Sequence, residues 1–462
     1  MIERKLLDIA RMCDGELYNI SHGDIDIKGV STDSRTVEKG NLYIPIVGEK
    51  FDGHDFAFNA LEKGAAAILW EKKRFLPRND IPVIIVEDSF KAMTKLAKSY
   101  RLSLKCKVVA LTGSNGKTTT KDIITGLLKQ KYKVDCTKKN FNNEYGLPKT
   151  IFELDEDCEI AVLELGTEKF GDISLLTDIC QPDYAIITNI GDSHLLKLKT
   201  KENIARAKLE ILEGLDENGI FLYNYDDPIL RKVVKEFKLP ERTFTYGMDK
   251  DCDFVIEPGI ADASGTTFTM DSHIYTVPLL GQHQMYNGGI AIIISEFFNL
   301  DYPTIAKGLT DIELTGMRNE LIHQKNFDIL NDSYKSNPQS LEACLRTIYS
   351  LKDYDKKIVV IGDMLELGVD EVQIHKDIAD ELDPQRLDYV LTIGTLAENI
   401  SDVAKQNFPE DTCFHFDSKK ELVEKLKEII TPNTLVMVKA SRAMKLEEIV
   451  NSLIEFERSI QW

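Results

Sequence analysis

The chain has 462 residues, of which 43% are hydrophobic and 29% are charged. This composition is typical of a folded protein and excludes a largely disordered one, and the length suggests about three folding units. Lys and Arg total 57 against 76 Asp and Glu, and the resulting net charge of −19 disfavours a general nucleic-acid-binding or anionic-membrane-binding surface. A polyanionic ligand would therefore have to bind at a local site.

The eight cysteines form no Cys-x-x-Cys pair and have no spacing typical of a metal site, which predicts reduced thiols in a cytoplasmic protein. Charged residues interrupt the first ten positions, and no run of about 18 apolar residues occurs. We therefore expect neither a standard export signal nor a membrane-spanning segment.

Residues 1–86 mix short apolar runs with Gly-Asp turns. One apolar run covers residues 42–47, and another ends the segment at 83–86. Short runs of this kind, bounded by turn residues, are typical of strands. We predict a small α/β domain over residues 1–86.

Residues 87–314 begin with a helical stretch that leads into an apolar run and a glycine-rich loop. Buried strands that alternate with helices predict a parallel sheet. The predicted strands cover residues 108–112, 160–163 and 185–188, and the predicted helix after the loop covers 118–130.

From residue 315 to 462 the alternation of strands and helices starts again. The predicted strands there cover residues 358–361, 390–393 and 435–438. This pattern predicts a third α/β domain. Since no repeat or long linker separates the segments, we expect three adjacent domains with hinges near residues 87 and 315.

The glycine-rich loop lies between a predicted strand and a predicted helix. Such a loop lets backbone N–H groups surround a phosphate, and the helix N-terminus adds a favourable dipole. Lys117 would contact the terminal phosphates and Thr118 would bind magnesium. The strict P-loop spacing requires a glycine where this chain has Leu111, so the loop is a shortened variant, and an accidental turn is the alternative. The predicted phosphate-binding residues are Thr112, Gly113, Ser114, Asn115, Gly116, Lys117, Thr118 and Thr119.

Two candidate ligands follow neighbouring predicted strands. Glu164 comes directly after the strand at 160–163, and His194 follows the strand at 185–188. Because the carboxyl ends of parallel strands meet at one edge of a sheet, both side chains would reach the loop, where a carboxylate is a natural magnesium ligand. A lone histidine is more often structural, but its position beside Glu164 favours a functional role.

Lys208 lies in a stretch with clear helical periodicity. Ile204, Ala205, Ile211 and Leu212 are three or four positions away, which places the Lys208 amine on the apolar face. Burial lowers the pKa of a lysine and makes its neutral amine available as a nucleophile or for modification. The alternative is a lysine whose amine extends to water from the helix edge.

Further motifs occur in order along the chain. They are Ser31-Thr-Asp-Ser-Arg35, Asp52-Gly-His54, Asn140-Phe-Asn-Asn-Glu-Tyr-Gly-Leu-Pro148, Thr188-Asn-Ile-Gly-Asp-Ser-His194, Gly281-Gln-His283 with Asn287, Gly316-Met-Arg318, Asn331-Asp-Ser-Tyr334 with Asn337-Pro338, Gly362-Asp-Met-Leu-Glu-Leu-Gly368 and Lys439-Ala-Ser-Arg442. Over essentially its whole length the chain thereby resembles the Mur ligases of peptidoglycan synthesis. Within that family it is most similar to the branch that adds D-alanyl-D-alanine to UDP-N-acetylmuramoyl-tripeptide.

The resemblance implies three α/β domains: an N-terminal UDP-sugar domain, a central P-loop-type parallel-sheet ATPase domain, and a C-terminal Rossmann-like domain that binds the incoming dipeptide. The substrate-binding residues that it implies are Ser31, Asp33, Ser34 and Arg35, for the UDP-sugar, and Asn142. The nucleotide-binding residues that it adds to the loop are Asn287 at adenine, Arg318 at the phosphates and Asp332 at the ribose. The metal ligands that it implies are Thr118, Glu164, His194 and Lys208, the last as a carbamate formed with carbon dioxide. The catalytic residues that it implies are Lys117, Glu164, His194, Lys208 and Arg318.

The implied reaction uses ATP and Mg²⁺ and has two steps. The substrate carboxylate attacks the γ-phosphate to give an acyl phosphate, and the amine of D-alanyl-D-alanine then displaces phosphate. We expect a cytoplasmic monomer that binds no nucleic acid and does not insert into membranes.

Some positions depart from the family pattern. The usual Asp-Ser-Tyr-Asn-Ala-Asn-Pro has Lys335 and Ser336 before Asn337, and the usual His-Asn is His283-Gln284. Other departures follow His194 and Glu164. A paralogue with a different amine acceptor is therefore an alternative, and a nucleotide-regulated binding module without turnover is a second.

Overall fold

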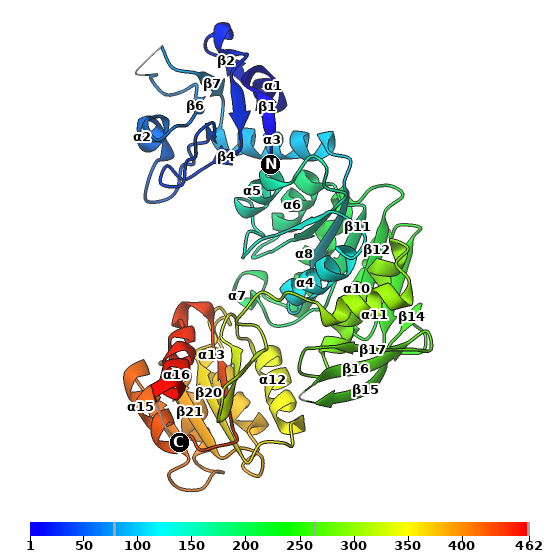
Figure 1. Ribbon diagram of the computed structural model, residues 1–462, viewed down its shortest axis with the longest axis vertical. Helices are drawn as coiled ribbons and strands as arrows, with labels where there is room; N and C mark the ends of the chain where they lie inside the picture. The colour runs from blue at the N-terminus through cyan, green and yellow to red at the C-terminus, as the bar shows by residue number, and fades with distance from the viewer. Residues whose placement is uncertain (77–79, 263, 460–462) are drawn as a thin grey trace.

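The computed structural model describes residues 1–76, 80–262 and 264–459. Three α/β units follow one another in chain order along the long axis of the molecule (Figure 1). The N-terminal unit lies at one end, the C-terminal unit at the other, and the central unit between them. The mixed α/β class and the central parallel sheet predicted from the sequence are confirmed.

The N-terminal unit contains a five-stranded sheet in the order β2-β7-β6-β5-β4. Only the β2–β7 pair is antiparallel among the pairs described. The apolar run at 42–47 forms a strand only at Leu42–Tyr43, and Pro45, which has no N–H to donate to a neighbouring strand, follows within it. The elements are β1 Glu3–Lys5, α1 Leu6–Met12, β2 Glu16–Leu17, β3 Asp26–Lys28, β4 Val30–Ser31, β5 Leu42–Tyr43, α2 Ala57–Glu62, β6 Ala67–Glu71 and β7 Val83–Val86.

The central unit is built on a seven-stranded sheet in the order β14-β13-β12-β11-β8-β10-β9, in which every described pair is parallel. A three-stranded antiparallel sheet, β15-β16-β17, packs beside it. The strands are β8 Lys107–Thr112, β9 Val134–Cys136, β10 Ile160–Glu164, β11 Tyr184–Ile187, β12 Ile220–Asn224, β13 Thr243–Gly247, β14 Phe254–Val255, β15 Glu257–Asp262, β16 Gly265–Met270 and β17 His273–Val277. The helices are α3 Ser89–Ser103, α4 Lys117–Leu128, α5 Gly146–Glu153, α6 Asp172–Cys180, α7 Leu195–Leu198, α8 Lys201–Leu209, α9 Pro228–Val233, α10 Gln284–Phe297 and α11 Tyr302–Thr310.

The C-terminal unit is a six-stranded sheet in the order β18-β19-β23-β20-β21-β22, with an antiparallel edge strand β18. Because β23 lies between β19 and β20, the strand order reverses there, and such a reversal opens a ligand-binding crevice at the carboxyl ends of the strands. The strands are β18 Glu320–His323, β19 Phe327–Asp332, β20 Lys356–Gly362, β21 Tyr389–Ile393, β22 Cys413–Phe416 and β23 Thr434–Lys439. The helices are α12 Pro338–Ser350, α13 Glu371–Ile378, α14 Glu398–Ala404, α15 Lys419–Ile429 and α16 Glu447–Ser459.

The hydrophobic core connects the first two units. One cluster of buried side chains extends from Ile2 and Leu6 through Leu96 and Tyr100 of α3 to Leu163 of the central sheet. The C-terminal sheet has separate clusters on its two faces. The predicted domain bounds 1–86, 87–314 and 315–462 stay predictions.

Candidate active site between the central and C-terminal domains

The glycine-rich loop connects β8 to α4, as the sequence predicts. A Cβ on Gly113, at φ +152°, would lie 1.8 Å from Thr188 Oγ1, and one on Gly116, at φ +80°, would lie 2.5 Å from Asn287 Oδ1. Only glycine combines this backbone conformation with so close an approach. The loop therefore packs tightly between the end of β11 and α10, with the free N–H groups of the first turn of α4 at its mouth.

The amine of Lys117 folds back over the loop. Its Nζ donates to the carbonyl oxygens of Gly113, at 2.7 Å, and Ser114, at 3.4 Å. Burial lowers the pKa of Lys117 to about 7, and the nearby Lys335 ammonium contributes to the same shift. An anionic ligand at this position would offset both effects.

Glu164 is the last residue of β10, and its side chain is 3% exposed. Its Oε2 accepts a hydrogen bond from Thr118 Oγ1, at 2.7 Å, and its Oε1 accepts one from Asn142 Nδ2, at 2.8 Å. Burial would raise the pKa of Glu164, but Lys117, Arg318 and these hydrogen bonds outweigh it and hold the pKa below its usual value. The carboxylate is therefore ionised beside the loop.

Lys208 lies on α8 and is 2% exposed, which confirms the burial predicted for its side chain. Burial lowers the pKa of Lys208 far below its usual value, and the charges of Lys117 and Lys335 lower it further. A neutral amine is thus available there, in a region with surplus positive charge.

His194, at φ +66°, lies between two groups of the C-terminal domain. Its Nε2 is 3.5 Å from Lys335 Nζ, and its Nδ1 is 3.6 Å from Glu366 Oε2. Burial lowers the pKa of His194 to about 3, and Lys335 and Lys208 contribute. The imidazole is therefore neutral.

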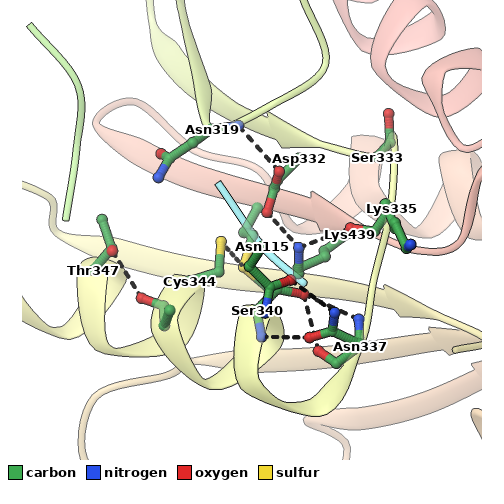
Figure 2. A network of polar contacts seen from close by, with 12 residues as sticks. Asn115, Asn319, Asp332, Ser333, Lys335, Asn337, Ser340, Cys344, Thr347 and Lys439 are labelled. Carbon is green, nitrogen blue, oxygen red and sulfur yellow. Dashed lines mark hydrogen bonds and ion pairs between the residues drawn. The ribbon is translucent and has the colours of Figure 1, made fainter. Parts of the chain in front are cut away.

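The C-terminal domain supplies a polar network at the ends of β19 and β23 (Figure 2). Asp332 accepts from the Asn319 N–H, at 3.1 Å, and pairs with Lys439 Nζ. Lys439 also donates to the carbonyl oxygen of Lys335, at 3.1 Å. The guanidinium carbon of Arg318 lies 4.0 Å from the centre of the Tyr334 ring.

Hydrogen bonds join the phosphate loop directly to the C-terminal domain. Asn337 Nδ2 donates to Asn115 Oδ1, at 2.8 Å (Figure 2). The same Nδ2 donates to Ser193 Oγ, at 3.1 Å. Asn115 Nδ2 in turn donates to Gln339 Oε1, at 3.3 Å. Asn337 also caps α12, since its Oδ1 accepts from the Ser340 N–H.

These groups surround a cavity of about 850 Å³ between the two domains, which is within the size range of cofactor and substrate sites. The predicted residues that line it are Ser114, Asn115, Gly116, Lys117, Thr119, Asn142, Glu164, His194, Lys208, Asn287, Arg318 and Asp332. Thr112, Gly113 and Thr118 are buried beneath the lining. The cavity thus gathers residues from two domains that are far apart in the sequence.

Asn287 lies at the far end of the phosphate loop. Its Oδ1 accepts from Thr120 Oγ1, at 3.1 Å, and its Nδ2 donates to Gln284 Oε1, at 2.8 Å. Gln284, one of the departures from the family pattern, therefore positions the Asn287 amide.

The predicted sugar-binding residues Ser31, Asp33, Ser34 and Arg35 lie at and after β4 in the N-terminal domain, outside the cavity. Arg35 forms a two-pronged pair with Asp33, with Nε at 2.9 Å and Nη2 at 2.7 Å from its carboxylate oxygens. These hydrogen bonds lower the pKa of Asp33 to about 2. The Arg35 side chain is otherwise exposed.

The residues present fit a magnesium ion on one side of the site only. Thr118 Oγ1 and the ionised Glu164 place oxygen donors together, and Mg²⁺ binds to one or two carboxylates together with phosphate oxygens. Both ring nitrogens of His194 instead face charged groups of the C-terminal domain. Among the residues that the structure describes, no group of three His, Cys, Asp or Glu is placed to hold a metal ion without a ligand's help.

Sequence reasoning missed several residues of the site. Lys335 stands out in the sequence only as a departure from the family pattern. Asn189 and Glu366 lie within two of the motifs that carry the resemblance, which assigns them no role, and Gln339 lies in none of them. Asn189 accepts from the Asn115 N–H through Oδ1, at 3.0 Å, and so supports the phosphate loop.

A phosphate loop on a parallel sheet, facing a second α/β domain across a polar cavity, is the architecture of a three-domain ATP-using ligase. Three family models match in chain order: "Mur ligase family, catalytic domain" over residues 26–101, "Mur ligase middle domain" over 111–295 and "Mur ligase, glutamate ligase domain" over 317–442. The chain belongs to the Mur ligase family.

Several similar proteins carry the name of one branch of that family. The UDP-N-acetylmuramoyl-tripeptide–D-alanyl-D-alanine ligase of Bacillus subtilis is 42% identical, covering 98% of this chain and 99% of the relative, and that of Escherichia coli is 30% identical with the same coverage. A crystal structure of MurF from Acinetobacter baumannii matches with a TM-score of 0.88 at 25% identity, covering 98% of this chain and 99% of that one. The MurF ligase of Thermotoga maritima in complex with ADP matches with a TM-score of 0.82 at 28% identity, covering 93% and 98%. Within residues 1–76, 80–262 and 264–459, no helix combines the length and apolar character needed to cross a membrane.

Proposed function

We propose that this chain is an ATP-dependent ligase that joins D-alanyl-D-alanine to UDP-N-acetylmuramoyl-tripeptide, a step in the synthesis of peptidoglycan precursors. The observation that carries the proposal is the cavity in which the phosphate loop and Glu164 face Arg318 and Lys335 of the C-terminal domain. The relatives that carry this activity in their names match the chain from end to end.

The reaction proceeds in two steps. An oxygen of the tripeptide's terminal carboxylate attacks the γ-phosphorus, and the bond to the ADP oxygen breaks, which gives an acyl phosphate and ADP. The amine of D-alanyl-D-alanine then attacks the acyl carbon; phosphate leaves, and the amine loses a proton to form the amide. Lys117 and Arg318 neutralise charge on the phosphoryl oxygens, which is the main source of rate enhancement in phosphoryl transfer.

Thr118 and Glu164 are the residues that would hold Mg²⁺, which would supply charge neutralisation at the phosphates. Asn287 would contact the adenine, and Asp332, which pairs with Lys439, would contact the ribose. Ser31, Asp33, Ser34 and Arg35 would bind the UDP-sugar in the N-terminal domain, and Asn142 the substrate near Glu164. The Rossmann-like C-terminal domain would bind the dipeptide.

Lys208 is proposed to be carbamylated. Its neutral amine attacks carbon dioxide, a C–N bond forms, and one proton is released. The resulting anion would lie near the cations Lys117 and Lys335, whose charges disfavour an ammonium at this place. A ¹³C signal of the carbamate, after incubation with labelled bicarbonate, would support the modification, and its absence in native enzyme would exclude it.

Phosphate release in the presence of ATP, UDP-N-acetylmuramoyl-tripeptide and D-alanyl-D-alanine tests the function. We expect release that depends on all three, with the pentapeptide product found by mass spectrometry. Release only with another amine would identify a paralogue of different acceptor specificity, and no release with any acceptor would reject the ligase. The eight free thiols support a cytoplasmic location, and a monomer is expected in size-exclusion chromatography.

A further inference from the structure

Lys335 stands on the loop between β19 and α12, at a position where the family pattern has asparagine. Its ammonium reaches across the domain boundary to His194, with 3.5 Å between Lys335 Nζ and His194 Nε2. Figure 2 shows the loop between Asp332 and Asn337 with Lys335 on it. The departure therefore lies in the active site itself.

The two nitrogens of His194 have different partners. A neutral imidazole has one N–H donor and one acceptor nitrogen. Nδ1 faces the Glu366 carboxylate, at 3.6 Å, and Nε2 faces an ammonium that can only donate. The tautomer that satisfies both carries its proton on Nδ1 and offers the Nε2 lone pair to Lys335.

That lone pair is the one a metal ion would need. A divalent cation bound to Nε2 would lie about 2.1 Å from it, and so within a few ångströms of the Lys335 ammonium. Like charges at that separation repel strongly in a partly buried site. The ammonium and a metal ion at His194 are thus mutually exclusive.

The backbone around Lys335 is fixed on both sides. Lys439 donates to the carbonyl oxygen of Lys335, and Lys439 is itself paired with Asp332. Two residues further on, Asn337 is bound to Asn115 and Ser193. These contacts hold the backbone from which the Lys335 side chain reaches His194.

We propose that Lys335 takes the place of a metal ion at His194, so that this chain works with a single magnesium ion, at Thr118 and Glu164, and a fixed ammonium opposite it. The inference rests on the proposed function for the identity of the phosphoryl group that the ammonium would face. The ammonium supplies positive charge there only when the C-terminal domain is closed on the central one.

Mn²⁺ binding to the full-length protein saturated with ADP tests the inference, with bound and free Mn²⁺ separated by electron paramagnetic resonance. We expect wild type to bind a single Mn²⁺ ion, and Lys335→Asn to bind a second. At the Mn²⁺ concentration that half-fills the second site of Lys335→Asn, the same site should be less than about one-tenth filled in wild type, because the ammonium repels the ion. Lys335→Met, which removes the charge and keeps the length of the side chain, serves if Lys335→Asn does not fold.

Three further variants sharpen the result. His194→Ala should leave the wild-type Mn²⁺ count unchanged and should abolish the second ion in the Lys335→Asn background. Lys201→Asn, which removes an ammonium paired with Asp192 outside the cavity, should bind as wild type does. Two ions in wild type, or one ion in both wild type and Lys335→Asn, would overturn the inference. Failure of the ligase proposal would instead be seen as absent phosphate release, whatever the Mn²⁺ count.

Discussion

Three amines and a guanidinium converge on the cavity. Lys117, Lys335 and Lys208 each have a pKa below the usual value, and burial is the largest cause in each case. Neighbouring lysines lower the pKa of Lys117 and Lys208 further, whereas Glu366 opposes the lowering at Lys335. Glu164 and several other carboxylates also line the cavity. Phosphate oxygens bound beside the buried amines would raise the pKa values of those amines.

Nucleotide binding should be accompanied by proton uptake. The pKa of Lys117 is about 7 in the free protein, so near pH 8 its amine is mostly neutral, and phosphates that raise this pKa cause it to take up a proton. ADP titrations by calorimetry, in buffers of different ionisation enthalpy, measure the uptake. Lys117→Met should take up fewer protons than wild type, and equal uptake in the two proteins would contradict the assignment to Lys117.

Turnover should depend on Lys208. Lys208→Ala removes the amine that the carbamate requires, and we expect phosphate release to fall by about a thousandfold or more, as for the loss of a preorganised electrostatic group. Short carboxylic acids should restore part of it by occupying the vacated space. Lys201→Ala, on the same helix and outside the cavity, is the matched control. Full activity of Lys208→Ala would reject the carbamate.

The sequence predicts where a side chain lies when its place is set by the end of a single strand or the face of a single helix. Glu164 follows from its place after an apolar strand, and the burial of Lys208 follows from helical periodicity. The contact between Lys335 and His194 could not be predicted, because it joins loops of two domains and depends on how those domains dock. Whether the predicted residues act as proposed stays to be tested.

At the scale of elements, the glycine-rich loop depends on its first glycine. Gly113→Ala would bring a Cβ to 1.8 Å from Thr188 Oγ1 at a φ of +152°. We expect a loss of about 1–3 kcal/mol of unfolding free energy and weaker ADP binding, measured by thermal melts with and without ADP.

Gly171→Ala is a control that introduces the backbone strain of a positive φ without a steric clash at the new Cβ. Gly171 also has a positive φ, of +87°, but no described atom lies within 4 Å of its Cβ position. Gly171→Ala should therefore lower the free energy of unfolding less than Gly113→Ala does, and it should leave ADP binding unchanged. Equal losses in the two variants would show that the contact with Thr188 is unimportant.

Strands with long apolar runs were predicted closely. The runs at 160–163 and 358–361 correspond to β10 and β20, and the helix predicted at 118–130 is observed at Lys117–Leu128. The strands β9 and β14 were missed because they are short edge elements with half-buried residues. The strand β12 was not predicted, although it is fully buried, because no recognised motif lies in its segment.

At the scale of the whole molecule, Asn337 tests whether the observed domain contact matters for activity. Asn337→Asp keeps an oxygen to cap α12 but loses the N–H groups that bind Asn115 and Ser193. We expect nearly unchanged thermal stability and a lower rate of phosphate release. Asn337→Ala should also lose the helix cap, which should lower the free energy of unfolding by about 1 kcal/mol. An unchanged rate in both variants would show that the bridge is dispensable.

The three-domain arrangement also predicts closure, which would exclude water from the acyl phosphate. Small-angle scattering should give a smaller radius of gyration with ADP and UDP-sugar peptide than without them. An unchanged envelope would count against closure. The sequence suggested three domains, but their mutual placement rests on side-chain contacts such as Asn115 with Gln339, which no local pattern encodes.

The bridge from the phosphate loop to Asn337 and Gln339 makes the nucleotide site and the C-terminal domain thermodynamically dependent on each other. If a dipeptide bound to the C-terminal domain increases the affinity for ADP by some factor, ADP must increase the affinity for that dipeptide by the same factor. Reciprocity of this kind can be checked without turnover, from two binding titrations performed in opposite order. The loop that we propose to hold phosphate would thus also report whether the second substrate has bound.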